Sequence, residues 1–172
     1  SSRMKAPAYC KTLPGISMAR LTEGRLLPTD HLRLINGNPL VGKRVAMDGY
    51  LSLRATEVCA IPEGDDCHEV LGWIMPRLNQ YSTRRSYFSW LMPRREYDLD
   101  ARVKGGRRHI IMSGEYDKVL PMDILGEYLI KAILTGDFDR MEQLGLLEVA
   151  PEDFAVAEFV DSSKLELQRI VR

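Results

Sequence analysis

The stretch PMDILGEYLIKAILT, residues 121–135, carries the clearest secondary-structure signal in the sequence. Apolar side chains recur in it at spacings of three and four, which is the period of one helix face: Met122, Leu125, Tyr128, Leu129, Ala132 and Ile133. Pro121 is tolerated in a first helical turn, and Gly136 suits the position just after a helix end. The sequence therefore predicts a helix over 121–135.

Three further helices are predicted around this one. The first covers 137–144, capped by Asp137 and ended by Gly145, and the second covers 151–159, with a proline and two acidic residues in its first turn. The third begins at Asp161-Ser162-Ser163 and runs to Arg172. Short helices with glycine and proline joints predict a small all-α domain over 110–172.

Residues 1–76 predict small β structure around one helix. The predicted helix covers 16–24, and Asn36-Gly37-Asn38-Pro39 is a dense turn signal. Four short strands are predicted, at 8–13, 31–35, 50–58 and 70–75. The class predicted for the whole chain is therefore α+β.

Composition excludes several classes of protein. The chain has 172 residues, 45% of them hydrophobic, with 24 basic and 24 acidic side chains. Its longest run without Asp, Glu, Lys or Arg, from Leu34 to Gly42, is about half of the ~18–20 residues that a membrane span needs. Three cysteines and three scattered histidines predict neither a disulfide scaffold nor a metal site. The start Ser1-Ser2-Arg3 predicts a piece of a longer chain.

Charge is distributed unevenly along the chain. Residues 77–109 carry nine basic and three acidic side chains, whereas 110–172 carry six and thirteen. The basic segment is interleaved with aromatic residues, a pattern that suits stacking on single-stranded nucleic acid. The neutral total charge favours instead a docking face for an acidic partner, or for the acidic third of this chain. The candidate interface residues are Arg84, Arg85, Trp90, Arg94 and Arg95.

Motifs for catalysis or phosphate binding are missing from the sequence. Gly37-x-x-x-x-Gly42-Lys43 lacks the Ser or Thr that a phosphate loop needs after its lysine, because Arg44 follows. We interpret the segment as a turn, with Gly37, Asn38 and Gly42 as a candidate ligand lip. No catalytic residue and no metal ligand is predicted.

Three separated motifs resemble one protein family. They are Leu71-Gly72-Trp73-Ile74-Met75-Pro76, then Ser82-Thr83-Arg84, then Gly114-Glu115-Tyr116-Asp117-Lys118-Val119-Leu120-Pro121-Met122-Asp123. In order and spacing they resemble the A subunit of the bacterial sodium-translocating NADH:quinone oxidoreductase. The resemblance implies a β-grasp, ubiquitin-like domain of the soluble-ligand-binding (SLBB) type over 1–109, with 77–109 as a basic connecting segment. It implies a helical domain over 110–172.

The helical part also resembles the cluster-binding, ferredoxin-like domains of two related proteins, the complex I flavoprotein subunit together with the Rnf C subunit. None of the eight positions that would match their cysteines is Cys here: Ile110, Ser113, Tyr116, Leu120, Pro151, Phe154, Ala157 and Asp161. Without thiolates there is nothing to hold iron. We therefore expect no iron–sulfur centre, and expect side chains such as Leu120, Phe154 and Ala157 to fill the space.

The resemblance implies a peripheral subunit of a respiratory complex that oxidises NADH, reduces ubiquinone to ubiquinol and exports Na⁺ from cytoplasm to periplasm. Flavins (FAD, FMN), NADH, ubiquinone and Na⁺ belong to the complex, and no cofactor is expected in this chain. The expected partners are the other subunits, above all the membrane-embedded B subunit, and the expected location is the cytoplasmic face of the inner membrane. The expected role of this chain is docking near the quinone-reduction step. A stand-alone module binding a quinone or cofactor is the alternative, and a nucleic-acid binder is a third.

Overall fold

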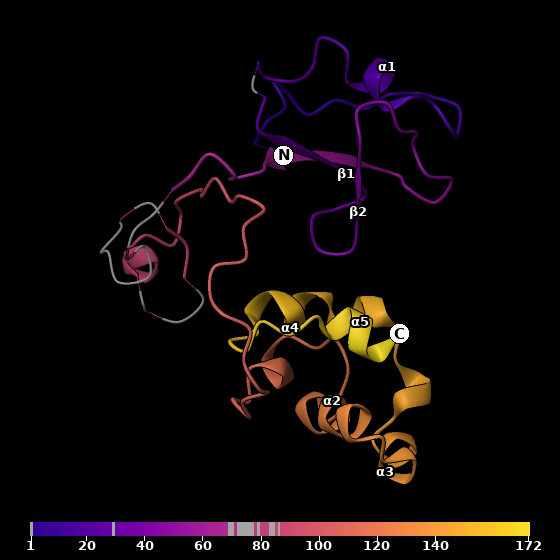
Figure 1. The fold of residues 1–172 in the computed structure, drawn as a ribbon, viewed down its shortest axis with the longest axis vertical. Coiled ribbons are helices and arrows are strands. Elements are labelled where there is room, and N and C mark those ends of the chain that lie inside the picture. The colour runs from indigo at the N-terminus through magenta and orange to yellow at the C-terminus, as the bar shows by residue number, and fades with distance from the viewer. Residues whose placement is uncertain are drawn as a thin grey trace. The chain divides into compact units, whose positions relative to one another are not determined.

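The computed structural model describes residues 2–28, 30–68, 71, 78, 80–82, 85 and 87–172. It divides the chain into two compact units, Ser1–Arg102 and Val103–Arg172, which are described separately below. The first holds a three-stranded antiparallel sheet and the second is helical, so the coarse α+β class is confirmed (Figure 1). The division lies a few residues before the boundary at 109/110 placed by the sequence.

The sheet of the first unit has the strand order β2-β1-β3. Its strands are β1 (Leu32–Asn36), β2 (Lys43–Val45) and β3 (Val58–Pro62). The central residue Leu34 pairs with Val45 on one side and Ala60 on the other. Leu34 and Ala60 are buried together with Met18 of helix α1 (Met18–Thr22), and these three make the core of the unit. The predicted helix 16–24 and strand 31–35 are thus confirmed.

Two other predicted strands are wrong. Residues 8–13 form no strand, and Tyr9 and Leu13 are almost fully exposed, so this stretch does not bury its large apolar side chains. Of 50–58 only Val58 belongs to a strand, because a turn closed by the Ala55 amide on the Ser52 carbonyl interrupts the run. The predicted strand 70–75 lies outside the described residues, apart from Leu71, which is in no strand.

The second unit packs four α-helices around one apolar core: α2 (Gly126–Thr135), α3 (Phe138–Gln143), α4 (Ala155–Val160) and α5 (Leu167–Val171) (Figure 1). A short 3₁₀ turn, η2 (Tyr116–Lys118), precedes α2, and two more, η3 (Leu146–Glu148) and η4 (Pro151–Phe154), lie between α3 and α4. The fully buried side chains of this core come from α2, η2, η4, α4 and α5: Tyr116, Leu129, Ile130, Phe154, Ala157 and Leu167.

Three of the predicted helix boundaries need correction. Helix α2 begins at Gly126, not at Pro121, since the preceding residues form tight turns such as Ile124 N–H to the Met122 carbonyl. The predicted helix 151–159 is split into η4 and α4. Helix α5 begins only at Leu167, because the Asp161 carboxylate accepts the amides of Ser163 (3.0 Å) and Leu165 (2.9 Å) and holds a turn there.

Other helix ends are as predicted. Gly136 ends α2 with φ +71°, a conformation that favours glycine. The Asp137 carboxylate accepts the Arg140 amide at 3.2 Å and caps α3, and Gly145 follows that helix with φ +88°. No helix among the described residues combines the length and apolarity of a membrane span.

Candidate functional site

The candidate interface lies on a short 3₁₀ turn, η1 (Phe88–Leu91), and the segments on either side of it. We define the basic-aromatic face as the exposed residues Arg85, Phe88, Trp90, Leu91, Arg94 and Arg95. Trp90 and Leu91 are 49% and 58% exposed, so these apolar side chains meet solvent and are not core. The helical spacing of Tyr87, Phe88, Trp90 and Leu91 is typical of an apolar core stripe flanked by solvated arginines, but the exposure of Phe88, Trp90 and Leu91 contradicts that interpretation.

The buried member of this turn is polar. Ser89 is 6% exposed, and its hydroxyl accepts the Ser82 amide at 3.1 Å and donates to the Ser82 carbonyl at 3.2 Å. These bonds satisfy the polar group that is buried and fix the turn on its inner side. The apolar neighbours of Ser89 are thereby exposed while Ser89 itself is buried. This is the reverse of the usual preference, in which apolar side chains are buried and polar ones face solvent.

Two of the candidate arginines stack on aromatic rings. The Arg85 guanidinium lies 5.2 Å from the centre of the Trp90 ring, and that of Arg95 lies 5.8 Å from the Tyr97 ring. Arg95 also donates to the Leu78 carbonyl at 3.0 Å. Such stacking fixes a guanidinium and leaves its edges available for an anion.

The structure thus brings together Arg85 and Trp90 of the five candidate residues. Arg94 is exposed on the same face, and Arg95 is turned toward Tyr97. Arg84 lies outside the described residues.

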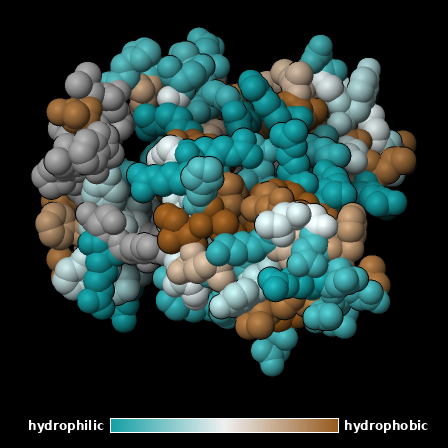
Figure 2. Space-filling model, turned by 60° about the horizontal axis from the view of Figure 1, so that its bottom comes forward, coloured by the Kyte–Doolittle hydropathy of each residue, from teal (hydrophilic) through white to brown (hydrophobic). Residues whose placement is uncertain are grey.

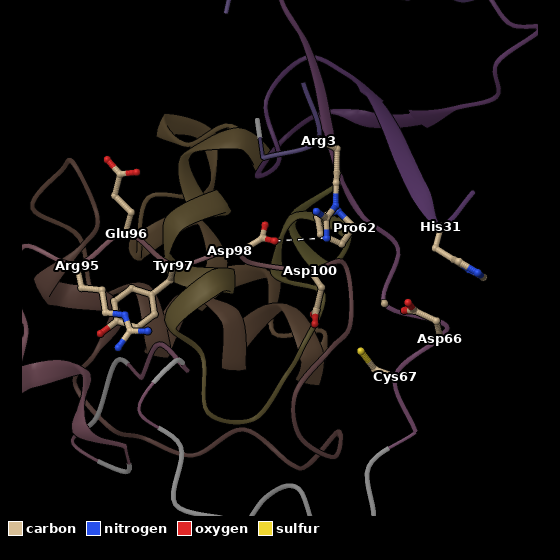
Figure 3. Close-up of a pocket in the computed structure, with 11 residues that line it drawn as sticks. Arg3, His31, Pro62, Asp66, Cys67, Arg95, Glu96, Tyr97, Asp98 and Asp100 are labelled. Carbon is tan, nitrogen blue, oxygen red and sulfur yellow. Dashed lines mark ion pairs between the residues drawn. The ribbon is translucent and has the colours of Figure 1, made fainter. Parts of the chain in front are cut away.

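A polar depression of about 430 Å³ lies beside Arg95 in the first unit (Figure 3). Residues from four separate parts of the chain line it, among them Arg3, His31, Cys67 and Asp98. Arg3 pairs with Asp98 at 3.4 Å across the depression. No motif or spacing indicates this site, because its residues are brought together only by the fold.

Within the described part of the chain, two polar atoms at this depression are buried without a hydrogen-bond partner, Arg3 Nε and Tyr97 Oη. Both can donate a hydrogen bond. At its rim, His31 Nδ1 lies 2.8 Å from Asp65 Oδ1, and this hydrogen bond and charge raise the pKa of His31 and lower the pKa of Asp65. The depression could therefore hold a small polar group that offers acceptor atoms.

The candidate ligand lip is a turn built by internal hydrogen bonds. Asn38 Oδ1 accepts the amides of Leu40 and Val41, both at 2.9 Å, and the Gly42 amide donates to the Asn38 carbonyl at 2.8 Å. A Cβ at Gly42 would lie 2.5 Å from Ile35 Cγ2, and Gly37 has φ +100°. The close contact at Gly42 and the positive φ at Gly37 explain why the turn has glycine at both positions.

Most of the eight positions at which the resemblance implies cluster cysteines in relatives lie in or near the core of the helical unit. Tyr116, Phe154 and Ala157 belong to its fully buried core, and Ile110 and Leu120 pack against that core. Asp161 is also buried. Leu120, Phe154 and Ala157 thus contribute to the packing of this unit.

Two buried carboxylates flank the Tyr116 phenol. Glu127 Oε1 accepts from Ser113 N (3.0 Å), Ser113 Oγ (3.1 Å) and Glu115 N (3.3 Å). The Tyr116 hydroxyl is buried and makes no hydrogen bond of ordinary geometry with any described residue. Burial, followed by the charges of Asp161 and Glu127, raises the pKa of Tyr116 above its usual range, so the phenol stays neutral.

Among the described residues, no group of three or more His, Cys, Asp or Glu side chains is placed to hold a metal ion. Cys10 and Cys67 are exposed and Cys59 is partly buried. Burial, and after it the charge of Glu57, raises the pKa of the Cys59 thiol, which disfavours the reactive thiolate.

Comparison with known proteins adds the following findings. A family model described as "NQRA C-terminal domain" matches residues 1–46. Proteins named as the A subunit of Na(+)-translocating NADH-quinone reductase, from Shewanella frigidimarina and Yersinia pestis, are 34% identical over 171 residues, which is 99% of this chain and 38% of theirs. The protein of that name from Haemophilus influenzae is 34% identical over 172 residues, with the same coverage. The chain therefore spans about two fifths of the length of these relatives.

Proposed function

Since this chain belongs to the family formed by the A subunit of Na(+)-translocating NADH-quinone reductases, we propose that it forms a docking part of such a protein. The observation that carries the proposal is the match over 99% of this chain. In this proposal the assembled complex oxidises NADH, reduces ubiquinone to ubiquinol and moves Na⁺ from cytoplasm to periplasm, while the chain itself holds no cofactor and has no catalytic activity.

The proposed docking surface is the basic-aromatic face. Trp and Arg are the residues that contribute most to protein interfaces, and here they are exposed and stacked on one another. The proposed partners are the other subunits, above all the membrane-embedded B subunit, reached at the cytoplasmic face of the inner membrane. Arg84, Arg85, Trp90, Arg94 and Arg95 are the residues proposed to make this contact.

We also propose how the two units arose. The first would be a β-grasp domain of the SLBB type, and the second a ferredoxin-like helical domain that has lost its iron–sulfur cluster. The packing of Tyr116, Phe154 and Ala157 into one core supports the second part, since the resemblance implies cluster cysteines at these positions in relatives. In this proposal the helical unit is an assembly scaffold.

A second candidate function is the binding of a small quinone or cofactor. The polar depression favours it, since Arg3 Nε and Tyr97 Oη are buried there without partners among the described residues and could donate to a carbonyl oxygen. Titration of the chain with a quinone analogue tests it. Saturable binding that is lost in Tyr97→Phe would support this function. If the chain does not bind the analogue, this function is refuted and docking is the proposed function.

Assembly of the complex tests the docking proposal. The full-length A subunit, as wild type and as Arg85→Glu with Arg94→Glu, is used to capture the remaining subunits from membranes. We expect the double variant to lose capture, while a control with Arg20→Glu and Arg54→Glu, two other exposed arginines of the first unit, retains it. Equal capture by all three proteins would refute the docking face.

A further inference from the structure

The segment that bears the basic-aromatic face has an unusual composition. Between Val70 and Arg95 there is no Asp, Glu, Lys or His, and all five charged side chains are arginines. The next acidic residue is Glu96, and Asp98 beyond it is engaged by Arg3. The segment is thus purely cationic in a chain whose total charge is zero. It is suited to an anionic surface.

The same segment also exposes apolar side chains. Among its described residues, six large apolar side chains are between 42% and 63% exposed: Leu71, Leu78, Tyr81, Phe88, Trp90 and Leu91. At η1 this exposure is imposed by the fold, since the buried Ser89 hydroxyl is bonded to the Ser82 backbone and Phe88, Trp90 and Leu91 are left in solvent. Figure 2 shows hydrophobic side chains, in brown, reaching the surface among hydrophilic ones.

We infer that the basic-aromatic face contacts the anionic headgroup region of a phospholipid bilayer. Indole rings with apolar neighbours are favoured at the depth where headgroups meet acyl chains, and arginines there bind lipid phosphates. The Arg85–Trp90 stack, 5.2 Å from guanidinium to ring centre, presents both groups at one point. Phe88 and Leu91, which begin and end the same turn, supply further apolar area beside Trp90.

An acidic protein partner is the other occupant that the charge would suit, but the spread of exposed apolar groups favours lipid. A protein partner would have to offer a matching apolar cavity for each of them, whereas the bilayer interface is fluid and adapts to their arrangement. The inference rests on the proposed function, because it concerns the same face and a protein held at a membrane. It adds the bilayer as a direct contact of this chain.

Flotation with lipid vesicles tests the inference. The full chain is mixed with vesicles of phosphatidylcholine alone, or of phosphatidylcholine and phosphatidylglycerol in equal parts. We expect binding to the anionic vesicles only, weakened by added salt. Arg85→Gln with Arg94→Gln should weaken that binding roughly fivefold for each arginine removed. Phe88→Ala with Trp90→Ala should weaken it roughly tenfold.

Matched controls alter similar residues elsewhere in the first unit. Arg20→Gln with Arg54→Gln removes the same charge, and Tyr9→Ala with Leu53→Ala removes exposed apolar groups. Both controls should bind the anionic vesicles like wild type. Circular dichroism of each variant checks that it is folded, and the altered side chains are all exposed.

The outcomes separate this inference from the docking proposal. The lipid contact is overturned if the face variants and the controls lose vesicle binding to the same extent. It is also overturned if the wild-type chain does not bind anionic vesicles. If the face variants fail to capture the other subunits and no vesicle binding is seen, the occupant is an acidic protein, which also overturns it. Vesicle binding that depends on the face supports the inference even where capture of the other subunits is unaffected, in which case the docking proposal alone fails.

Discussion

The ion pair between Arg33 and Glu63 joins β1 to the residue that follows β3. Arg33 Nε donates to Glu63 Oε2 at 2.9 Å, and its Nη2 donates to Oε1 at 2.5 Å. The Glu63 side chain is only 16% exposed. The hydrogen bonds and charge of Arg33 therefore lower the pKa of Glu63, and those of Glu63 raise the pKa of Arg33. A two-bond pair of this kind is stronger than an ordinary surface pair.

Replacing Glu63 by Gln should lower the free energy of unfolding by about 1 kcal/mol at neutral pH. Because the pKa of Glu63 is lower in the folded state, its contribution is complete above the unfolded value and is lost as pH falls through the folded one. The difference between wild type and Glu63→Gln should therefore shrink in acid. Urea unfolding at several pH values measures it.

The control for this prediction is Glu23→Gln, at the exposed position that ends α1, which should behave like wild type at every pH. A difference between Glu63→Gln and wild type that persists below the folded pKa of Glu63 would contradict the ion-pair explanation.

Removal of the Tyr116 hydroxyl, unlike the loss of the Glu63 carboxylate, should not lower the free energy of unfolding. The hydroxyl is buried and makes no hydrogen bond of ordinary geometry with the described residues, although Asp161 lies close enough to raise its pKa, so Tyr116→Phe removes a poorly satisfied polar group and keeps the ring. We expect the variant to be as stable as wild type, or more stable by up to about 1 kcal/mol, in urea unfolding. Destabilisation by more than about 1 kcal/mol would mean that the hydroxyl has a partner, of which Asp161 is the first candidate.

At the scale of elements, the end of α2 depends on one glycine. Gly136 has φ +71°, and nothing lies within 4 Å of the place where a Cβ would be. Gly136→Ala should therefore cost about 1–2 kcal/mol from backbone conformation alone. Gly106→Ala, where there is also open space and no positive φ, should be neutral. Thermal unfolding of the two variants measures the contrast, and equal stability would contradict it.

Local signals predicted helix ends better than strands. Gly136, Asp137 and Gly145 act through their own backbone or side chain, so the sequence was sufficient to place them. A strand forms only where it can pair with other strands. Residues 31–35 contribute to β1, which pairs with β2 and β3, whereas residues 8–13 lie in no strand. The candidate interface residues Arg85 and Trp90 were chosen from composition, which did not predict the exposure of η1. It depends on the bonds of Ser89 to Ser82, which no spacing indicates.

At the scale of the whole molecule, each unit has its own core. Met18, Leu34 and Ala60 form the core of the first unit, and the second has a separate core around Phe154. Phe154→Ala should cost the helical unit about 3–5 kcal/mol, because it leaves a cavity. We expect faster amide exchange in α2 with little change in β1.

The reciprocal variant, Leu34→Ala, serves as the control and should speed exchange in β1 and not in α2. Amide exchange followed by mass spectrometry distinguishes the two cases. Equal loss of protection in both units after either substitution would show that they unfold as one.

The turn held by Asp161 also ties the two ends of the helical unit to each other. The Arg108 amide donates to the Ser163 carbonyl at 2.8 Å, and the Ile111 amide donates to the Ser163 hydroxyl at 3.1 Å. These bonds close a loop that contains α2, α3 and α4. A protease that cuts once in the exposed stretch around Leu147 would consequently leave two fragments that stay associated, and they would separate only on denaturation.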